Sequence, residues 1–276
     1  MEKLKVGLQL YGVRDHMEKN VEETLKAVKE AGYDYVEFAG YFGIEAPEMK
    51  AILDKYGLTA ISAHQTYESI LENPEYYINY YKTLGIKYSA IPWMPADKQK
   101  GSPDYKETIA KIEKTGRILA DAGIDLLYHN HDFEFEYYEG KTKFDWLYDS
   151  VPAEFLKAET DVCWIHYAGF DPCEIINKYS GRVPIVHLKE YTGHKSEVPV
   201  YALIDDSGNN MEKKASEGDF RFARLGVGTV DIPAVLKASA AAGAQYVVVE
   251  QDESYEVDSL ENARLSRQYL KEVAGF

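Results

Sequence analysis

Cysteine is scarce in this chain, which contains only Cys163 and Cys173. Two cysteines are too few for a disulfide framework, and their spacing is not that of paired zinc ligands, so we interpret both as packing thiols. Long apolar runs are also missing, and nothing predicts a signal peptide or a membrane span. We therefore expect a cytoplasmic protein that has no membrane partner.

Basic residues are outnumbered, with 31 Lys and Arg against 46 Asp and Glu and a formal net charge of −15. The basic residues form no cluster along the sequence. Such a chain repels phosphate backbones, so we expect no nucleic-acid partner and a small-molecule ligand instead. Low-complexity tracts are absent, and a hydrophobic fraction of 45% is typical of an ordinary globular protein. Oligomeric state is left open, and a homo-oligomer is possible.

Short apolar runs alternate with longer amphipathic stretches along the whole sequence. No G-x-G-x-x-G fingerprint follows the first run, which disfavours a doubly wound dinucleotide-binding sheet. We predict a single (β/α)8 TIM barrel over residues 1–276, because barrels of this type commonly reach such a length as one domain. Its eight strands are expected at Lys5–Leu10, Asp34–Phe38, Thr59–Ala63, Tyr88–Pro92, Asp125–His129, Phe155–Thr160, Pro184–Leu188 and Tyr246–Glu250.

The stretches between the runs carry helix signals. Asn20 is a candidate N-cap with Glu23 three residues later, and Gly32 is a stop signal. Asp104–Gly123 and Asp231–Gly243 follow the same pattern. Residues 190–225 break the rhythm with one strand-like piece, "VPVYALI", and we predict an elaborated loop or hairpin after the seventh strand that would act as a lid over the barrel mouth.

Polar residues stand at the C-terminal ends of the predicted strands, where TIM barrels place their active sites. The set comprises Gln9, Glu37, His64, Trp93, His129, His131, Asp161, His187, Lys189, Glu250 and Asp252. Strand periodicity puts His129 and His131 on one face, with Asn130 turned away, provided that the strand continues to residue 131.

Four of these side chains, on the last four strands, have the donor types that bind divalent cations. We predict one such ion held by His129, Asp161, His187 and Glu250. The alternative for each residue alone is a polar cap that binds backbone or water. Asp161 follows Lys157 and Glu159 on its face, which would require an ion pair inside the barrel and leaves the register of the sixth strand the least certain.

Five motifs occur in the order "LQLYGVRD", "YHNH", "HLKE", "GVGTVD" and "VVVEQD". With these motifs the chain resembles the xylose-isomerase-like TIM-barrel superfamily. Within it, the chain is most similar to the sugar phosphate isomerase/epimerase group, which includes inosose dehydratases and ketose 3-epimerases. The resemblance runs almost end to end, and it is specific for the superfamily but not for a substrate.

The resemblance implies one divalent metal, often manganese. A histidine in place of one carboxylate ligand lowers the negative charge of the site and makes it more tolerant of zinc, cobalt or iron, and magnesium is a further alternative. The resemblance also implies a Glu, an Asp, a His and a Glu as ligands on strands 5 to 8, and the last three match Asp161, His187 and Glu250. The strand-5 Glu is replaced by His129. The histidine that epimerases of the group carry three residues after the strand-6 Asp is replaced by Trp164, and His166 lies five residues after Asp161.

These departures bear on the implied chemistry. In the epimerases the two glutamates resemble a two-base pair, and His129 removes one of these bases. We therefore expect one-base isomerisation or β-elimination on a small sugar, keto-sugar or inosose, with Glu250 or His131 as the base. Lys189 or Glu37 would stabilise the enediolate or protonate the leaving hydroxyl.

Substrate contacts are expected from Gln9, His64, Trp93 and Trp164, although packing explains the tryptophans and His64 almost as well. "GVGTVD" is either a phosphate-binding turn or a tight turn into a helix. Two other functions stay open: a non-catalytic carbohydrate-binding or regulatory barrel, and a DNA-repair enzyme of the endonuclease IV type. The second needs three zinc ions and a basic groove, which the net charge disfavours.

Overall fold

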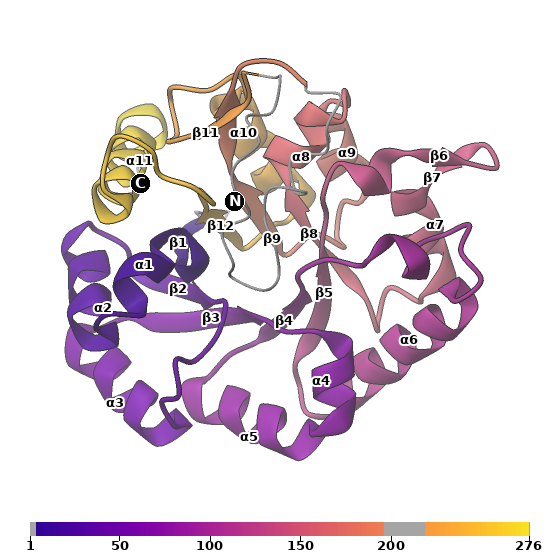
Figure 1. Cartoon of the computed structure of the whole chain (residues 1–276), viewed down its shortest axis with the longest axis horizontal. Helices are drawn as coiled ribbons and strands as arrows, with labels where there is room; N and C mark the ends of the chain where they lie inside the picture. Colours follow the sequence, from indigo (N-terminus) through magenta and orange to yellow (C-terminus); the bar gives the residue numbers. More distant parts are fainter. Residues whose placement is uncertain (1–3, 196–218, 276) are drawn as a thin grey trace.

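The computed structural model describes residues 4–195 and 219–275. Eight parallel strands close into a barrel in the order β1-β12-β9-β8-β5-β4-β3-β2 (Figure 1). Their bounds are β1 Lys5–Gln9, β2 Tyr35–Phe38, β3 Thr59–His64, β4 Tyr88–Ile91, β5 Asp125–His129, β8 Lys157–Asp161, β9 Ile185–Leu188 and β12 Tyr246–Val249. The predicted TIM barrel is confirmed, and the predicted strands agree with these bounds to within about two residues.

One longer helix follows each barrel strand and lies on the outside of the barrel (Figure 1). These helices are α2 Val21–Glu30, α3 Ala46–Tyr56, α5 Pro74–Leu84, α6 Tyr105–Asp121, α7 Lys143–Ser150, α9 Pro172–Lys178, α10 Ile232–Ala242 and α11 Ser259–Ala274. Shorter helical turns occupy the connections, namely η1 Leu10–Val13, α1 Arg14–Met17, α4 Tyr67–Glu72, η2 Ala96–Lys98, η3 Phe133–Phe135 and α8 Val162–Tyr167. No helix among the described residues is both long and apolar enough to cross a membrane.

Two of the three predicted N-caps act as expected, whereas the side chain of Asp104 makes no capping hydrogen bond at the start of α6. The side chain of Asn20 accepts a hydrogen bond from the backbone N–H of Glu23, at 3.1 Å. Asp231 caps α10 in the same way, through the N–H of Ala234 at 3.0 Å. Gly243 ends that helix in the left-handed conformation, with φ of +88°, which a residue with a side chain adopts only at a cost. Both cysteines are free thiols.

Successive residues of the barrel strands face two different apolar cores in turn. Ile185 and Val248 belong to a small core inside the barrel, whereas their neighbours Val186 and Val247 belong to the large core beneath the helices. His187 and Glu250 lie two residues after Ile185 and Val248. Strand periodicity therefore turns them inward as well, nearer the C-terminal ends of the strands. The inside of the barrel is therefore apolar at its base and polar at its top.

Strand β3 contains a bulge that changes which of its residues face inward. Opposite β2, Val36 pairs with Ala60 and Glu37 pairs with Ser62, so Ile61 is passed over. Ile61 lies in the inner core, and Ser62 contacts the buried Glu37. Strict alternation would place Ala60 on the same face as Ser62 and His64, but the bulge shifts the alternation and Ala60 packs in the outer core.

The segment after β9 begins and ends as a hairpin. Strand β10, Glu190–Thr192, pairs antiparallel with β11, Arg221–Ala223. A second small hairpin joins β6, Tyr137–Tyr138, to β7, Lys141–Thr142. The predicted strand-like piece "VPVYALI", residues 198–204, lies outside the described residues, and the lid stays a prediction.

Candidate active site

A cavity of about 400 Å³ opens where the barrel strands end. Its walls include many of the polar residues expected at this edge, among them His64, Trp93, His129, His131, Lys189 and Glu250. Gln9 and Trp164, expected to contact substrate, do not line it: Gln9 lies beneath it and Trp164 is fully buried. The site predicted from separate strands is thus one continuous pocket with a buried polar floor.

The four predicted metal ligands meet in a group that we call the rim cluster: His129, Asp161, His187 and Glu250. One donor atom from each residue lies within 4.8 Å of the other three. The Nε2 atom of His129 lies 3.3 Å from Oδ2 of Asp161 and 3.6 Å from Oε2 of Glu250, and Nδ1 of His187 lies 2.9 Å from the same Glu250 oxygen. All four side chains are buried.

The rim cluster fits a divalent cation because several of its donor atoms are buried without a hydrogen bond, and their contacts are ion pairs with one another and with Lys189. Both ring nitrogens of His129 and the Oδ2 atom of Asp161 are buried without a hydrogen bond to any described residue. Oδ1 of Asp161 is already used, since it accepts the N–H groups of Cys163 and Trp164 at the start of α8. An unpartnered buried polar atom is unfavourable, and coordination to an ion would satisfy these atoms.

Lys189 lies beside the rim cluster and neutralises part of its charge. Its Nζ atom is 3.1 Å from Asp161 Oδ2, 2.9 Å from Glu250 Oε2 and 2.9 Å from Asp252 Oδ1. Although burial opposes ionisation, Lys189 holds the pKa of Asp161 and that of Glu250 below their usual values. Burial raises the pKa of Asp252 to about 6 despite the same lysine. Asp161 and Glu250 are therefore carboxylates at neutral pH, as cation ligands must be.

His131 reaches the cavity although β5 ends at His129. Its ring is 5.3 Å from that of His129 and stacks on Phe133 at 5.3 Å. Trp164 lies behind it, also at 5.3 Å. Burial, followed by the neighbouring His129 and Lys189, lowers the pKa of His131 well below its usual value, so its imidazole is neutral. Trp93 forms part of the cavity wall with 39% of its surface exposed.

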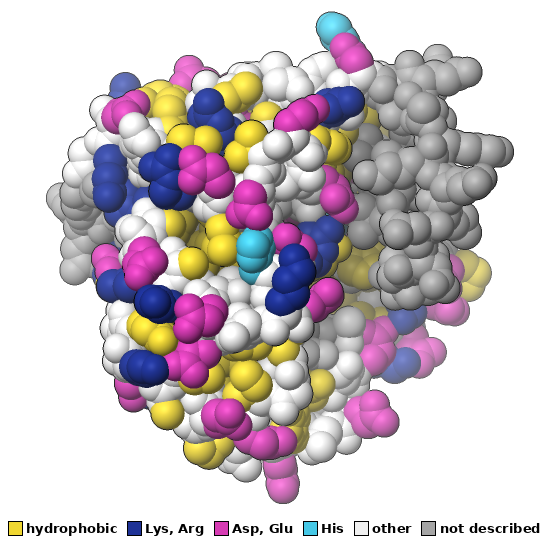
Figure 2. All heavy atoms as spheres, turned by 60° about the vertical axis from the view of Figure 1, so that its left-hand side comes forward, with side chains coloured by type: hydrophobic (Ala, Val, Ile, Leu, Met, Phe, Trp, Pro, Cys, Tyr) yellow, Lys and Arg dark blue, Asp and Glu magenta, His cyan; other side chains and the backbone are white. Residues whose placement is uncertain are grey.

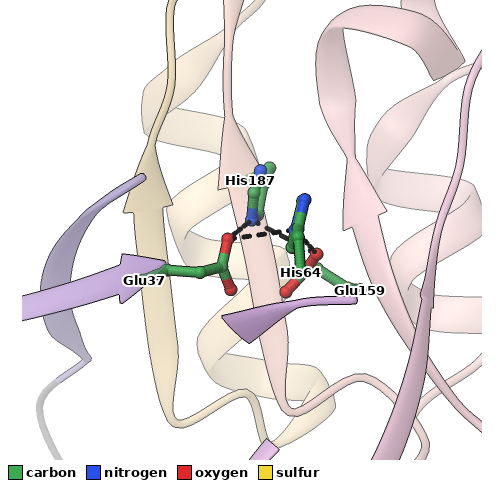
Figure 3. A group of neighbouring side chains, drawn as sticks. All are labelled: Glu37, His64, Glu159 and His187. Carbon is green, nitrogen blue, oxygen red and sulfur yellow. Dashed lines mark hydrogen bonds and ion pairs between the residues drawn. The ribbon is translucent and has the colours of Figure 1, made fainter. Parts of the chain in front are cut away.

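A second polar group lies below the rim cluster, and we call it the barrel tetrad: Glu37, His64, Glu159 and His187 (Figure 3). The side chains come from β2, β3, β8 and β9 and point toward one another inside the barrel (Figure 3). His187 belongs to both groups, since its Nδ1 faces Glu250 and its Nε2 faces Glu37.

Glu159 is the residue of this group that the sequence analysis did not assign to a site. Strand periodicity had placed it on the inner face, but with Lys157 as the expected partner. The structure instead pairs Lys157 with Asp125 at 2.7 Å, outside the cluster, and Glu159 contacts the two histidines. The signal that could have identified Glu159 as a site residue was that an acidic side chain faces inward from a buried strand.

The backbone amides of the "GVGTVD" turn are already bound by an acidic side chain of the same chain. The Oε2 atom of Glu190 accepts the backbone N–H groups of Gly226 at 2.6 Å and Gly228 at 3.2 Å. These amides are the donors that a phosphate would use. Since a carboxylate of the same chain occupies them, the structure favours the tight-turn interpretation.

Basic side chains are scattered among acidic ones on the face shown in Figure 2. Several described lysines and arginines pair directly with carboxylates, for example Lys29 with Asp34, Lys55 with Glu22 and Arg264 with Glu261. Ion pairs of this kind cancel the positive potential that a phosphate backbone requires.

Comparison with known proteins supports the architecture. The chain is similar to the inosose dehydratase of Geobacillus kaustophilus, with 23% identity over 201 residues that cover 65% of this chain and 64% of the relative. It is also similar to the rhizopine catabolism protein MocC of Rhizobium meliloti, with 25% identity over 92% of this chain and 82% of that protein. The first of these matches spans less than two thirds of the relative's length.

The fold matches a solved sugar phosphate isomerase/epimerase from Parabacteroides distasonis, with a TM-score of 0.78, 21% identity, and coverage of 99% of this chain and 96% of that chain. At this identity the match is evidence for the fold alone. The model of the family described as xylose isomerase-like TIM barrel matches residues 25–273. Since this match covers most of the sequence, the chain belongs to the xylose isomerase-like TIM barrel family.

Proposed function

We propose that the chain is a divalent-metal-dependent enzyme that isomerises a small sugar, keto-sugar or inosose, or eliminates water from it, at the rim cluster. The observation that carries this proposal is the convergence of four buried donors from four strands, with the nitrogens of His129 and one Asp161 oxygen lacking a hydrogen bond. The inosose dehydratases among the relatives support a dehydratase activity.

His129, Asp161, His187 and Glu250 would hold the ion. When bound there, a divalent ion would polarise a substrate carbonyl and make the hydrogen on the adjacent carbon more acidic. The chain offers two groups that can accept that proton. His131 is neutral and lines the cavity, and Glu250 is ionised and lines it as well.

Lys189 supplies the complementary charge. Its buried ammonium lines the same cavity, and there it would donate a proton to a leaving hydroxyl or stabilise a developing oxyanion. Glu37 does not line the cavity, because its carboxylate is bound by Gln9, Ser62 and His187 below. We therefore assign Glu37 a positioning role through His187, rather than the direct catalytic role expected from the sequence.

One-base chemistry fits this site better than two-base epimerisation. The second glutamate of a two-base pair is replaced by His129, which faces Asp161 and Glu250 as a ligand would. With the Gly226–Gly228 amides already bound to Glu190, a substrate without a phosphate also fits better. Neutral inososes and keto-sugars are thus the first compounds to test.

The test combines metal content with turnover. Metal would be measured by elemental analysis in the purified chain, in His129→Ala and Asp161→Asn, and in the control His16→Ala, which alters an exposed Asp15–His16–Asp258 group. We expect an ion that both rim variants lose and the control keeps. Inososes and keto-sugars would then be followed by NMR in deuterated water, where loss of the α-hydrogen signal reports proton abstraction. An ion content that neither rim variant changes would refute the proposed site.

A further inference from the structure

Glu37 and Glu159 are fully buried acids whose charges need a counterpart. Among the described residues their ion-pair partners are His64 and His187, and neither a lysine nor an arginine reaches them. Ionised carboxylates in such a place are strongly unfavourable unless a positive charge balances them. Two protonated histidines or one divalent cation would supply that charge.

The geometry of the barrel tetrad distinguishes these two possibilities. Its donor atoms form a closed ring of alternating nitrogen and oxygen (Figure 3). Around this ring His64 Nε2 is 3.2 Å from Glu37 Oε1 and 2.7 Å from Glu159 Oε2, while His187 Nε2 is 2.7 Å and 3.4 Å from the same two oxygens. Tetrahedral ligands at about 2.0–2.2 Å from one ion are separated by about 3.3–3.6 Å. The 3.2 and 3.4 Å edges are close to this separation, and the two 2.7 Å edges would widen by less than about 1 Å when an ion binds.

Hydrogen bonding alone accounts for little of the ring. Of its four edges only His64–Glu159 has the geometry of a hydrogen bond. The Nε2 atom of His187 has no hydrogen bond to a described residue, although it lies 2.7 Å from Oε1 of Glu37. Four donor atoms within 4.8 Å of one another, with three of the four edges lacking hydrogen-bond geometry, are arranged as ligands that share an ion are.

The tetrad also lacks the internal cation that the rim cluster contains. Lys189 contacts Asp161 and Glu250 at 3.1 and 2.9 Å and competes with an ion for both carboxylates. No such ammonium contacts Glu37 or Glu159 among the described residues, so the two negative charges of the tetrad match one divalent ion. Outer contacts hold the ligands in place, because Gln9 and Ser62 both donate to Glu37.

An ion can reach the tetrad from the cavity. His64 lines the cavity and its side chain is 10% exposed, whereas the other three members are completely enclosed. The His64 imidazole therefore lies between the pocket and the buried ligands and would be the first to contact an incoming cation.

We propose that the barrel tetrad is a second divalent-cation site, filled before the rim cluster. Two imidazoles and two carboxylates suit zinc, cobalt, iron or manganese. With the tetrad filled, His187 would bind its ion through Nε2 and donate its Nδ1–H to Glu250, so the rim ion would keep three of the four ligands assigned above, namely His129, Asp161 and Glu250. This site goes beyond the proposed function, which requires only the rim ion.

The experiment is a zinc titration of the chelator-treated full chain, with binding followed by competition against a chromophoric chelator. Glu159→Gln and His64→Ala test the tetrad, Asp161→Asn tests the rim cluster, and His16→Ala controls for surface binding. Loss of a group that merely supports a ligand already weakens metal affinity by about 10- to 100-fold, so loss of a ligand should weaken it by about 100-fold or more.

We expect one tight equivalent of zinc that Glu159→Gln and His64→Ala lose and that Asp161→Asn and His16→Ala retain. Tight binding that survives both tetrad variants would overturn this inference. If only Asp161→Asn abolishes it, the rim site of the proposed function stands alone. If the tetrad variants lose the tight equivalent, and Asp161→Asn changes neither it nor any weaker equivalent, the tetrad stands and the proposed rim site fails.

Folding must be separated from binding in these variants. Circular dichroism and thermal unfolding of the metal-free proteins would show whether each tetrad variant is folded. Glu37→Gln provides an independent test if Glu159→Gln does not fold, because it removes a different corner of the ring. A folded Glu37→Gln that binds the first zinc as tightly as the unaltered chain would likewise contradict the inference.

Discussion

The side chain of Asn130 forms hydrogen bonds with both backbone groups of Asp161. Its Oδ1 accepts the Asp161 N–H at 2.9 Å, and its Nδ2 donates to the Asp161 carbonyl at 3.2 Å. Asn130 is fully buried and turned away from the cavity, as strand periodicity predicts. It ties the end of β5 to the end of β8 and so fixes a proposed cation ligand from behind.

Replacing Asn130 with alanine should therefore affect both stability and binding. Each buried backbone group left unpartnered costs about 1–3 kcal/mol, so we expect Asn130→Ala, which affects two such groups, to lower the free energy of unfolding by about 2–6 kcal/mol. Zinc affinity at the rim should fall as well, because Asp161 is no longer held. Urea unfolding is the measurement, and Asn177→Ala, on the exposed face of α9, is the control. Equal stability of the two variants would show that the two Asn130–Asp161 hydrogen bonds contribute little to the free energy of unfolding.

Lys189→Met tests the charge balance of the cavity. The substitution leaves Asp161, Glu250 and Asp252 buried without their ammonium, and breaking a buried ion pair in this way typically costs about 3–5 kcal/mol. We expect that loss in the metal-free protein and a smaller one with saturating manganese, which would replace the missing charge. The two losses are measured by urea unfolding of Lys189→Met and the unaltered chain, once in a chelator and once in saturating manganese. An identical loss under both conditions would argue against cation binding by these carboxylates.

Glu134 provides a prediction of pH dependence. It is buried between the Tyr128 hydroxyl and the His131 N–H, and burial raises its pKa to about 8. Because the folded chain holds this proton more tightly than the unfolded chain, its contribution to stability is complete below the ordinary pKa of about 4.5 and is lost as the pH rises toward 8. The loss is at most about 1.4 kcal/mol per pH unit.

Glu134→Gln removes this titration. The variant should therefore become more stable relative to the unaltered chain as the pH rises from 5 to about 8. The measurement is the unfolding free energy at several pH values in this range. Glu154→Gln, at an exposed position, should run parallel to the unaltered chain. A constant difference between Glu134→Gln and the unaltered chain at every pH would contradict the prediction.

Trp93→Ala tests the cavity wall. An aromatic face that contacts a sugar contributes about 1 kcal/mol, so the substitution should raise KM about fivefold for any substrate identified, with little change in stability. Trp146→Ala is a suitable control, because Trp146 is absent from the cavity lining and bonds the Tyr138 carbonyl instead. It should lower stability and leave KM unchanged. A Trp93→Ala enzyme with unaltered KM would place the substrate elsewhere in the pocket.

Periodicity and the helix signals were sufficient to predict the barrel, because parallel strands buried on both sides have a strong apolar pattern. The same alternation brought Lys189, Glu250 and Asp252 to the wall of one pocket, and it turned the fully buried His187 toward Glu250. It worked there because β9 and β12 run regularly, with Ile185 and Val248 inward just below.

What the sequence did not provide was the partner of each inward side chain. Glu159 lay on the correct face, but its contact with His64 depends on how strands 95 residues apart close the barrel. Gln9 and Trp164 illustrate the same limit. Both sit near strand ends, yet one supports Glu37 from below and the other packs behind His131, because depth inside a barrel depends on neighbouring strands.

The bulge in β3 has a consequence for how this interior can change. In a regular strand with Ile61 inward, His64 would point into the outer core and the ring of donors would have three corners. Deleting Ile61 would remove only the extra residue of the bulge and leave Ser62 opposite Glu37, whereas deleting Ala63, which lies between the bulge and His64, would turn His64 out of the ring without altering any of the four donor residues. The fourth corner thus depends on the length of one strand as much as on the identity of residue 64.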